Sequence, residues 1–268
     1  MKKMTTIRSF VYLILVTFVV ASCGKKQIET LQTKQLHPWV VYGEGHSFAD
    51  LEPVKDMIAT ISVFGNPSRD YIDKCHAAGI EVYHAVGGNE KTIDSPEKIA
   101  AVVESYVNDC MNNGYDGIDL DFEHLAPNVR ATYSDFLQRA SNALHAVGKK
   151  MSHCVGFYPA LYVDENTHLF YDPMVLERTC DLVRVMCYDM YCAPCVGVKE
   201  LADRDDCQGV GPTSNYLWTR ECMLYWKKRI STDKLVMALP AYGNDYKITV
   251  PVAGRQIYAS VPDKVIGE

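Results

Sequence analysis

The 268-residue chain has no excess of positive charge, because 27 Lys and Arg stand against 33 Asp and Glu for a formal net charge of −6. Nucleic-acid binding generally needs a basic patch, so this balance argues against a nucleic acid as partner. The chain also lacks a glycine-rich turn after its first β-rich run, which removes the usual sign of a nucleotide-binding sheet. It has no tandem repeat or low-complexity tract, which argues against repeat architectures.

A zinc-binding pattern is incomplete. Cys192 and Cys195 have the CxxC spacing of a redox pair or of half a zinc site. The second CxxC and a His pair at finger-like spacing are both missing, so we predict a local disulfide or two free thiols and no metal site. Nine of the ten cysteines lie beyond Cys23, and their pairing cannot be read from spacing alone.

The N-terminal residues lack the length of a membrane-spanning helix. Positive charges precede an apolar run at residues 10–20, which is shorter than the roughly 20 residues that a span needs and is typical of a secretion signal. Residues 20–23, Val-Ala-Ser-Cys, resemble the lipobox of bacterial lipoproteins. We expect a signal peptide over residues 1–22, lipidation at Cys23, a tether over residues 23–36 and a lipid-anchored location in the bacterial cell envelope, at the outer membrane or cell surface. An ordinary signal peptide with an incidental cysteine is the alternative.

The rest of the chain, residues 37–268, alternates β-rich runs with amphipathic stretches. Strands are predicted at residues 39–42, 57–64, 80–86, 117–123, 151–155, 182–188 and 235–239, with helices at 68–78, from 95 through at least 110, 128–147 and 216–229. Strands separated by helices of this length pair in parallel through right-handed crossovers. Seven such units fit a (β/α)₈ TIM-type barrel, an α/β fold, better than a doubly wound sheet.

One predicted strand carries three acids at two-residue spacing. Asp119, Asp121 and Glu123 share one strand face, while the apolar residues between them share the other. Neighbours on one face lie roughly 7 Å apart, so ionised carboxylates there repel one another and at least one pKa should rise. A solvated strand face is the structural alternative, but a fold gains nothing from turning three acids toward an interior.

Other polar residues follow two further strands. Tyr188 and Asp189 close the sixth predicted strand, and Tyr242 lies just past the seventh. Because reactive residues of such barrels gather at the C-terminal ends of the strands, we expect these side chains to meet Glu123 at one rim. Packing and loop capping are the structural alternatives for all three.

Three motifs together resemble a known family. Residues 116–123, Asp-Gly-Ile-Asp-Leu-Asp-Phe-Glu, match the DGxDxDxE signature of the chitinase-like glycoside hydrolases of family 18. Residues 186–189, Met-Cys-Tyr-Asp, resemble the MxYD segment of that family, and residues 239–243 resemble the sequence that closes its seventh strand. The likeness extends from Trp39 to Gly243.

The resemblance implies retaining, substrate-assisted hydrolysis of β-glycosidic bonds in glycans that contain N-acetylglucosamine, such as chitin oligosaccharides or the N-glycan core, without a cofactor. Glu123 would protonate the leaving oxygen and later activate water, while the acetamido oxygen of the substrate attacks the anomeric carbon. Asp121 would orient the acetamido group, and Asp119 would tune Asp121 by sharing a proton or hydrogen bond.

The resemblance also assigns roles at the rim. Tyr188 would donate a hydrogen bond to the acetamido carbonyl, and Asp189 would contact the sugar. Tyr242 would be a sugar platform or a core residue. Trp39 is interpreted as packing, since aromatic side chains are common at both ends of a barrel.

Two departures from the family pattern accompany the likeness. Ala85 stands where the family usually has a serine on the third strand. After Trp226 the sequence contains no tryptophan, although the eighth strand of the family usually supplies one, and we expect this chain to lack the eighth unit. The alternative function is therefore a catalytically inactive, chitinase-like glycan-binding lipoprotein.

Overall fold

The computed structural model describes residues 35–43, 46–156, 169–189, 212–248 and 259–267. The predicted lipidation site Cys23, most of the predicted tether and the pair Cys192 and Cys195 lie outside these residues. In the described residues no helix has both the length and the hydropathy to cross a membrane.

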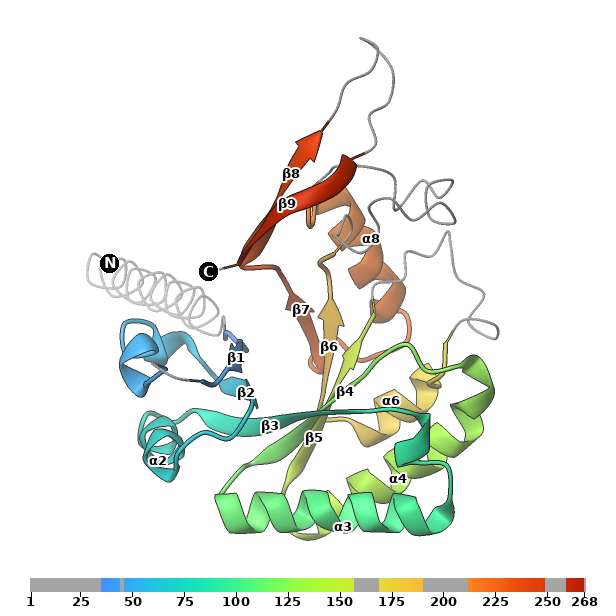
Figure 1. Ribbon diagram of the computed structural model, residues 1–268. Helices are drawn as coiled ribbons and strands as arrows, with labels where there is room; N and C mark the ends of the chain where they lie inside the picture. The colour runs from blue at the N-terminus through green and yellow to red at the C-terminus, as the bar shows by residue number, and fades with distance from the viewer. Residues whose placement is uncertain (1–34, 44–45, 157–168, 190–211, 249–258, 268) are drawn as a thin grey trace, which may run out of the picture.

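Seven parallel strands form one curled sheet in the order of the chain (Figure 1). They are β1 (Trp39–Val41), β2 (Thr60–Phe64), β3 (Glu81–Gly88), β4 (Gly117–Phe122), β5 (Lys150–Val155), β6 (Leu182–Met186) and β7 (Leu235–Ala238). The main helices are α2 (Arg69–Ala77), α3 (Pro96–Asn113), α4 (Arg130–Ala146), α6 (Pro173–Thr179) and α8 (Tyr216–Lys227). This arrangement confirms the predicted α/β barrel architecture as an open sheet, because β1 and β7 are not paired with each other in the described residues.

The chain leaves the sheet after β7. Strand β8 (Tyr242–Ile248) pairs antiparallel with β9 (Ala259–Gly267), and this hairpin lies beyond the C-terminal end of β7 in Figure 1. The sequence analysis placed Tyr242 just past the seventh strand, and the structure begins β8 at this residue. Tyr242 therefore opens a second sheet and does not merely follow the barrel strand.

Local sequence signals account for the helix ends. Ser68 precedes α2, and its hydroxyl accepts a hydrogen bond from the backbone of Tyr71. Ser95 caps α3 in the same way, with Pro96 at the first helical position and Gly114 in the left-handed conformation after the last. Both helices begin where the sequence predicts, because their capping residues are next to them in the sequence.

The outward face of β4 builds the core between sheet and helices. Ile118, Leu120 and Phe122 are all buried, and the Phe122 ring lies 5.5 Å from the rings of both Tyr133 and Phe136 on α4. Burying aromatic and branched side chains in this layer contributes roughly 1.5–3 kcal/mol for each. The prediction that this face is a packing layer is confirmed, and it fixes which face of β4 carries the acids.

The start of β4 is joined to its neighbours by Asp116. Its carboxylate accepts a hydrogen bond from the backbone N–H of Val82 at 2.8 Å and lies 2.8 Å from His76 Nε2 of α2. A Cβ at the following Gly117 would lie 2.5 Å from the Lys150 carbonyl oxygen and 2.6 Å from a ring carbon of Tyr83. Only glycine fits there, so the first two residues of the acidic motif have a packing role.

Candidate active site

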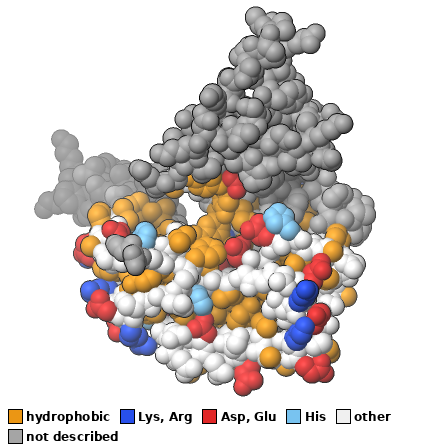
Figure 2. Space-filling view, viewed as in Figure 1, with side chains coloured by type: hydrophobic (Ala, Val, Ile, Leu, Met, Phe, Trp, Pro, Cys, Tyr) orange, Lys and Arg blue, Asp and Glu red, His pale blue; other side chains and the backbone are white. Residues whose placement is uncertain are grey.

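Three carboxylates lie in a row along the inner face of β4 and differ sharply in exposure. Asp119 is fully buried, Asp121 is half-buried, and the Glu123 side chain, just past the end of the strand, is 44% exposed. In Figure 2 acidic side chains gather near the upper end of the described part of the molecule, where hydrophobic side chains also reach the surface. The row therefore runs from the interior of the curled sheet to its rim.

Asp119 is surrounded by hydrogen-bond donors. Its Oδ2 accepts from Ser62 Oγ at 2.5 Å and from Trp39 Nε1 at 2.8 Å, and Ser152 donates to its Oδ1. Arg184 Nε lies 3.4 Å from Oδ2, and both side chains of this ion pair have zero exposure. The interpretation of Trp39 as a packing residue was therefore incomplete, because its indole N–H also donates a hydrogen bond to Asp119.

Asp121 has a very different environment. Its Oδ1 is buried and has no hydrogen-bond partner among the described residues. Burial first, and then the negative charges of Glu123 and Asp119, raise the pKa of Asp121 to about 6, while a hydrogen bond with Cys154 acts in the opposite direction. The pKa that is raised in this row is that of the middle acid, and burial contributes more to it than the crowding on which the sequence prediction rested.

Glu123 stands at the open end of the row. The imidazole Nε2 of the neighbouring His124 lies 3.7 Å from its Oε2. His124 has a positive φ of 57°, a backbone conformation that costs energy for a residue with a side chain and is often found at functional sites. The backbone turns sharply at this point, so Glu123 leaves the strand pointing into the open space.

The residues that follow β6 lie next to the first residue of β8. Tyr242 donates a hydrogen bond to Asp189 Oδ1 at 2.5 Å, and the Tyr188 ring lies 6.2 Å from the rings of both Tyr242 and Trp39. Asp189 also has a positive φ, of 59°. Burial raises the pKa of Tyr188, with further contributions that include the charges of Asp121 and Glu123. The Tyr188 hydroxyl therefore stays protonated near the carboxylates and remains a hydrogen-bond donor.

Comparison with known families decides what this arrangement is. The family described as glycosyl hydrolases family 18 matches residues 16–263. The chain belongs to this family.

Among its curated relatives is the uncharacterized glycosylase YvbX of Bacillus subtilis, 30% identical over 139 residues, which are 51% of this chain and 36% of YvbX. The chain thus spans about a third of the length of that relative. The C-terminal domain of a putative chitinase from Desulfitobacterium hafniense is similar in structure, with a TM-score of 0.69, 18% identity and coverage of 85% of this chain and 73% of that one. YKL-39, solved in the presence of chitooligosaccharides, has a TM-score of 0.66 at 13% identity and covers 85% and 72% of the two chains.

One departure from the family pattern has a structural explanation. Ala85, which replaces the usual serine of family 18, lies beside Asp119 in the register of β3 and β4. The hydroxyls of Ser62 on β2 and Ser152 on β5 bind the Asp119 carboxylate instead. The acid keeps its hydroxyl donors because strands on both sides of β4 supply them.

Sequence reasoning missed four residues of this family 18 site: Trp39, Ser62, Ser152 and Arg184. Only Arg184 left a usable signal. It is the one charged residue within the apolar run of β6, residues 182–186, and a buried charge in such a run requires a partner of opposite sign. Among the described residues, no group of three or more His, Cys, Asp or Glu is arranged to hold a metal ion.

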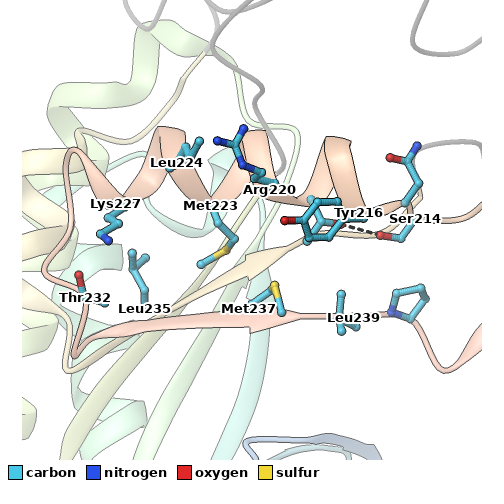
Figure 3. A pocket seen from close by; sticks show the side chains of 13 residues that line it. Ser214, Tyr216, Arg220, Met223, Leu224, Lys227, Thr232, Leu235, Met237 and Leu239 are labelled. Atoms are coloured by element: carbon cyan, nitrogen blue, oxygen red, sulfur yellow. Dashed lines mark hydrogen bonds between the residues drawn. The ribbon is translucent and has the colours of Figure 1, made fainter.

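A cavity of about 700 Å³ lies elsewhere, between α8 and the outer face of β7 (Figure 3). Leu235, Met237 and Leu239 alternate along one side of it, and Met223 and Leu224 of α8 line the other. None of the carboxylates lines this cavity. Since it occupies the face of β7 opposite to the barrel interior, it is separate from the chemistry of the family 18 motif.

Proposed function

We propose that the chain hydrolyses β-glycosidic bonds of N-acetylglucosamine-containing glycans, with retention and with the substrate's own acetamido group as nucleophile. The graded burial of the three acids of β4 is the observation that carries this proposal. A proton donor needs access to the leaving oxygen, and Glu123 is exposed at the rim. A group that stabilises a developing positive charge needs to lie deeper, as Asp121 does.

Asp121 suits the stabilising role because one of its oxygens is buried without a hydrogen-bond partner among the described residues. Such an atom is costly in the free protein and gains a partner when a donor such as an acetamido N–H arrives. The raised pKa of about 6 means that Asp121 changes charge near neutral pH, so it can hold a proton before the reaction and a negative charge opposite the cationic intermediate.

The aromatic residues of the rim support the same reading. Tyr188 keeps its proton and can donate a hydrogen bond to the acetamido carbonyl as it attacks. Tyr242 is held by Asp189 through a hydrogen bond of 2.5 Å, so its ring is fixed beside that of Tyr188. Fixed aromatic faces next to carboxylates are suited to bind sugar rings, and YKL-39 as a structural relative was solved with chitooligosaccharides.

The test compares the wild-type chain with Glu123→Gln on an aryl chitobioside and on a high-mannose glycoprotein. Loss of the general acid should lower the rate by roughly 10²- to 10⁴-fold. Glu104→Gln, which changes an exposed acid on α3, serves as the matched control and should keep the wild-type rate. Equal rates for the wild type and Glu123→Gln would refute the catalytic assignment. Calorimetric binding of chitooligosaccharide without turnover by the wild type would favour the glycan-binding alternative.

We also propose that Cys23 carries a lipid that anchors the chain to the bacterial cell envelope. The support is the sequence alone, since an apolar run at residues 10–20 leads into Val-Ala-Ser-Cys at residues 20–23. Expression of the full chain with a radiolabelled fatty acid should label the wild type, and Cys23→Ser should remain unlabelled. Label retained by Cys23→Ser would exclude this anchor.

A further inference from the structure

Arg184 extends from β6 across the interior of the curled sheet to the opposite strands. Its Nη1 donates a hydrogen bond to the His37 carbonyl at 2.9 Å, and its Nη2 donates one to Thr60 Oγ1 at 3.2 Å. The guanidinium carbon lies 5.6 Å from the ring centre of Trp39 and 5.9 Å from that of Tyr83. Contacts to β1, β2 and β3 thus fix the cation in one place.

The cation lies next to Asp119, the innermost acid of the carboxylate row on β4. Arg184 and Asp119 form an ion pair in which neither side chain has any exposure. The same carboxylate oxygen receives the indole N–H of Trp39, a group that can only donate. Removing a charge from water is expensive unless a counter-ion and hydrogen bonds replace the solvent. Here the counter-ion is present, and hydrogen bonds satisfy the Asp119 carboxylate and both terminal nitrogens of Arg184, whereas Arg184 Nε has no hydrogen-bond partner among the described residues. The contacts of the Asp119 carboxylate with Trp39, Ser62, Ser152 and Arg184 therefore all come from hydrogen-bond donors or a cation.

Among the residues that the structure describes, the other titratable groups beside this ion pair are not cations near pH 7. Burial lowers the pKa of His153 to about 4 and also lowers that of His37, while it raises the pKa of the Cys154 thiol. These three groups are therefore neutral near pH 7. Among the described residues, the titratable groups that interact electrostatically with Asp119 or Arg184 include Asp121, Cys154, Cys180, His153, His37 and Tyr83.

We propose that Arg184 fixes Asp119 as an anion and thereby confines the proton of the carboxylate row to Asp121 and Glu123, the two groups that open toward the substrate. Arg184 is then a positioning residue, since it acts through Asp119 and does not touch the reacting atoms. The consequence for turnover rests on the proposed function, whereas the location of the proton does not.

The direction in which the titration of Asp121 moves when Arg184 is replaced distinguishes this role from a direct electrostatic effect and from a purely structural one. Without Arg184, a buried Asp119 would have no counter-ion and would take up a proton itself. Asp121 would then lose a negative neighbour, and its titration would move to lower pH by about one unit for charges roughly 7 Å apart. If Asp119 stayed ionised, loss of the positive charge would instead move the titration to higher pH. A purely structural role would leave it unmoved.

The experiment follows the carboxyl carbon of Asp121 by NMR in protein labelled with ¹³C at aspartate carboxyls, assigned with Asp121→Asn. Wild type, Arg184→Met, Arg184→Lys and Thr60→Val are titrated in parallel. We expect a midpoint near pH 6 in the wild type, a midpoint about one unit lower in Arg184→Met, and a return toward the wild type in Arg184→Lys, which keeps the charge. Thr60→Val removes a partner of Arg184 without changing charge, so it should lower the melting temperature and leave the midpoint in place.

Turnover gives a second readout. The alkaline limb of the pH profile of kcat on an aryl chitobioside should move to lower pH in Arg184→Met, with KM nearly unchanged. An unshifted or higher Asp121 midpoint in Arg184→Met would overturn the inference. So would an ordinary midpoint near pH 4 in the wild type, which decides the matter even if Arg184→Met does not fold. If Glu123→Gln kept full activity while the Asp121 midpoint moved as expected, the proposed function would fail and the role of Arg184 would stand.

Discussion

The two ends of the row of carboxylates along β4 carry the same chemical group in opposite environments. At the inner end, Asp119 is fully buried and meets two hydroxyls, an indole N–H and a guanidinium. At the outer end, Glu123 is largely open to solvent, with the neighbouring His124 at 3.7 Å. The Asp119 carboxylate is contacted by side chains from four other strands, β1, β2, β5 and β6, whereas the Glu123 side chain is 44% exposed.

The difference shows how a barrel strand can combine stability and reactivity within a few residues. Side chains in the middle of a parallel strand face their neighbours on both sides, so donors can be placed around an acid by strands far apart in sequence. At the C-terminal end the neighbours fall away, and an acid there is available to a ligand. Asp121 lies between the two regimes, which is why its pKa is raised while it remains able to titrate.

The largest effect should come from breaking the inner end. Asp119→Asn leaves the buried Arg184 without its counter-ion, and we expect the free energy of unfolding to fall by about 3 to 5 kcal/mol. Glu123→Gln removes an exposed charge and should change it by less than about 0.5 kcal/mol. Urea denaturation of both variants measures the contrast. Equal losses of stability would show that the two ends are held in the same way.

The middle acid should make stability depend on pH. Its folded pKa of about 6 exceeds the ordinary value of 3.8, so the folded state binds the proton more tightly. The resulting stabilisation is fully present below pH 3.8 and is lost as the pH rises through 6, by about 2 to 3 kcal/mol in total. Unfolding free energies of the wild type and Asp121→Asn, measured from pH 3.5 to 8, should diverge by this amount. Parallel curves would contradict it.

Gly117, at the start of β4, tests how tightly this part of the strand is packed. Gly117→Ala places a methyl group against the Lys150 carbonyl and the Tyr83 ring, and we expect a loss of about 2 kcal/mol. Gly43→Ala is the matched control, because nothing lies within 4 Å of its added carbon. Thermal unfolding monitored by circular dichroism compares the two. A tolerated Gly117→Ala would mean that β4 and β5 can separate slightly at no cost.

The smallest effect is expected at the rim. Tyr242→Phe removes the hydrogen bond to Asp189 and should cost about 1 kcal/mol or less, because the pair is only half-buried. A calorimetric melting scan of Tyr242→Phe beside the wild type measures it. A loss as large as that of Asp119→Asn would place the rim among the rigid parts of the molecule and would undo the contrast.

The fold was predictable because its signals are local. Caps at Ser68 and Ser95, and alternation along residues 117–123, fix where helices and strands begin. The seven strands then have few alternative ways to pair, since crossovers of this length are right-handed. The hairpin of β8 and β9 was harder to place, because β8 contains Gly243, Asn244 and Asp245 and β9 contains Pro262, residue types that strands disfavour.

The partners of Asp119 could not be read from the sequence. Trp39, Ser62 and Ser152 come from three different strands, separated from Asp119 by 80, 57 and 33 residues. Each belongs to a strand whose pattern is explained by burial alone. Their convergence is a consequence of register, and single-sequence reasoning supplies strands without their register.

The packing role of Asp116 and Gly117 divides the acidic motif into two halves under different structural constraints. The first half joins β4 to its neighbours and to α2, and the acids of the second half lie along the inner face of the curled sheet up to its rim. A homologue could lose Glu123 and keep Asp116 and Gly117, since the barrel needs these whether or not sugar is cut. Recognition of a chain by the whole octapeptide therefore reports ancestry, and the residue at position 123 has to be inspected separately before activity is assigned.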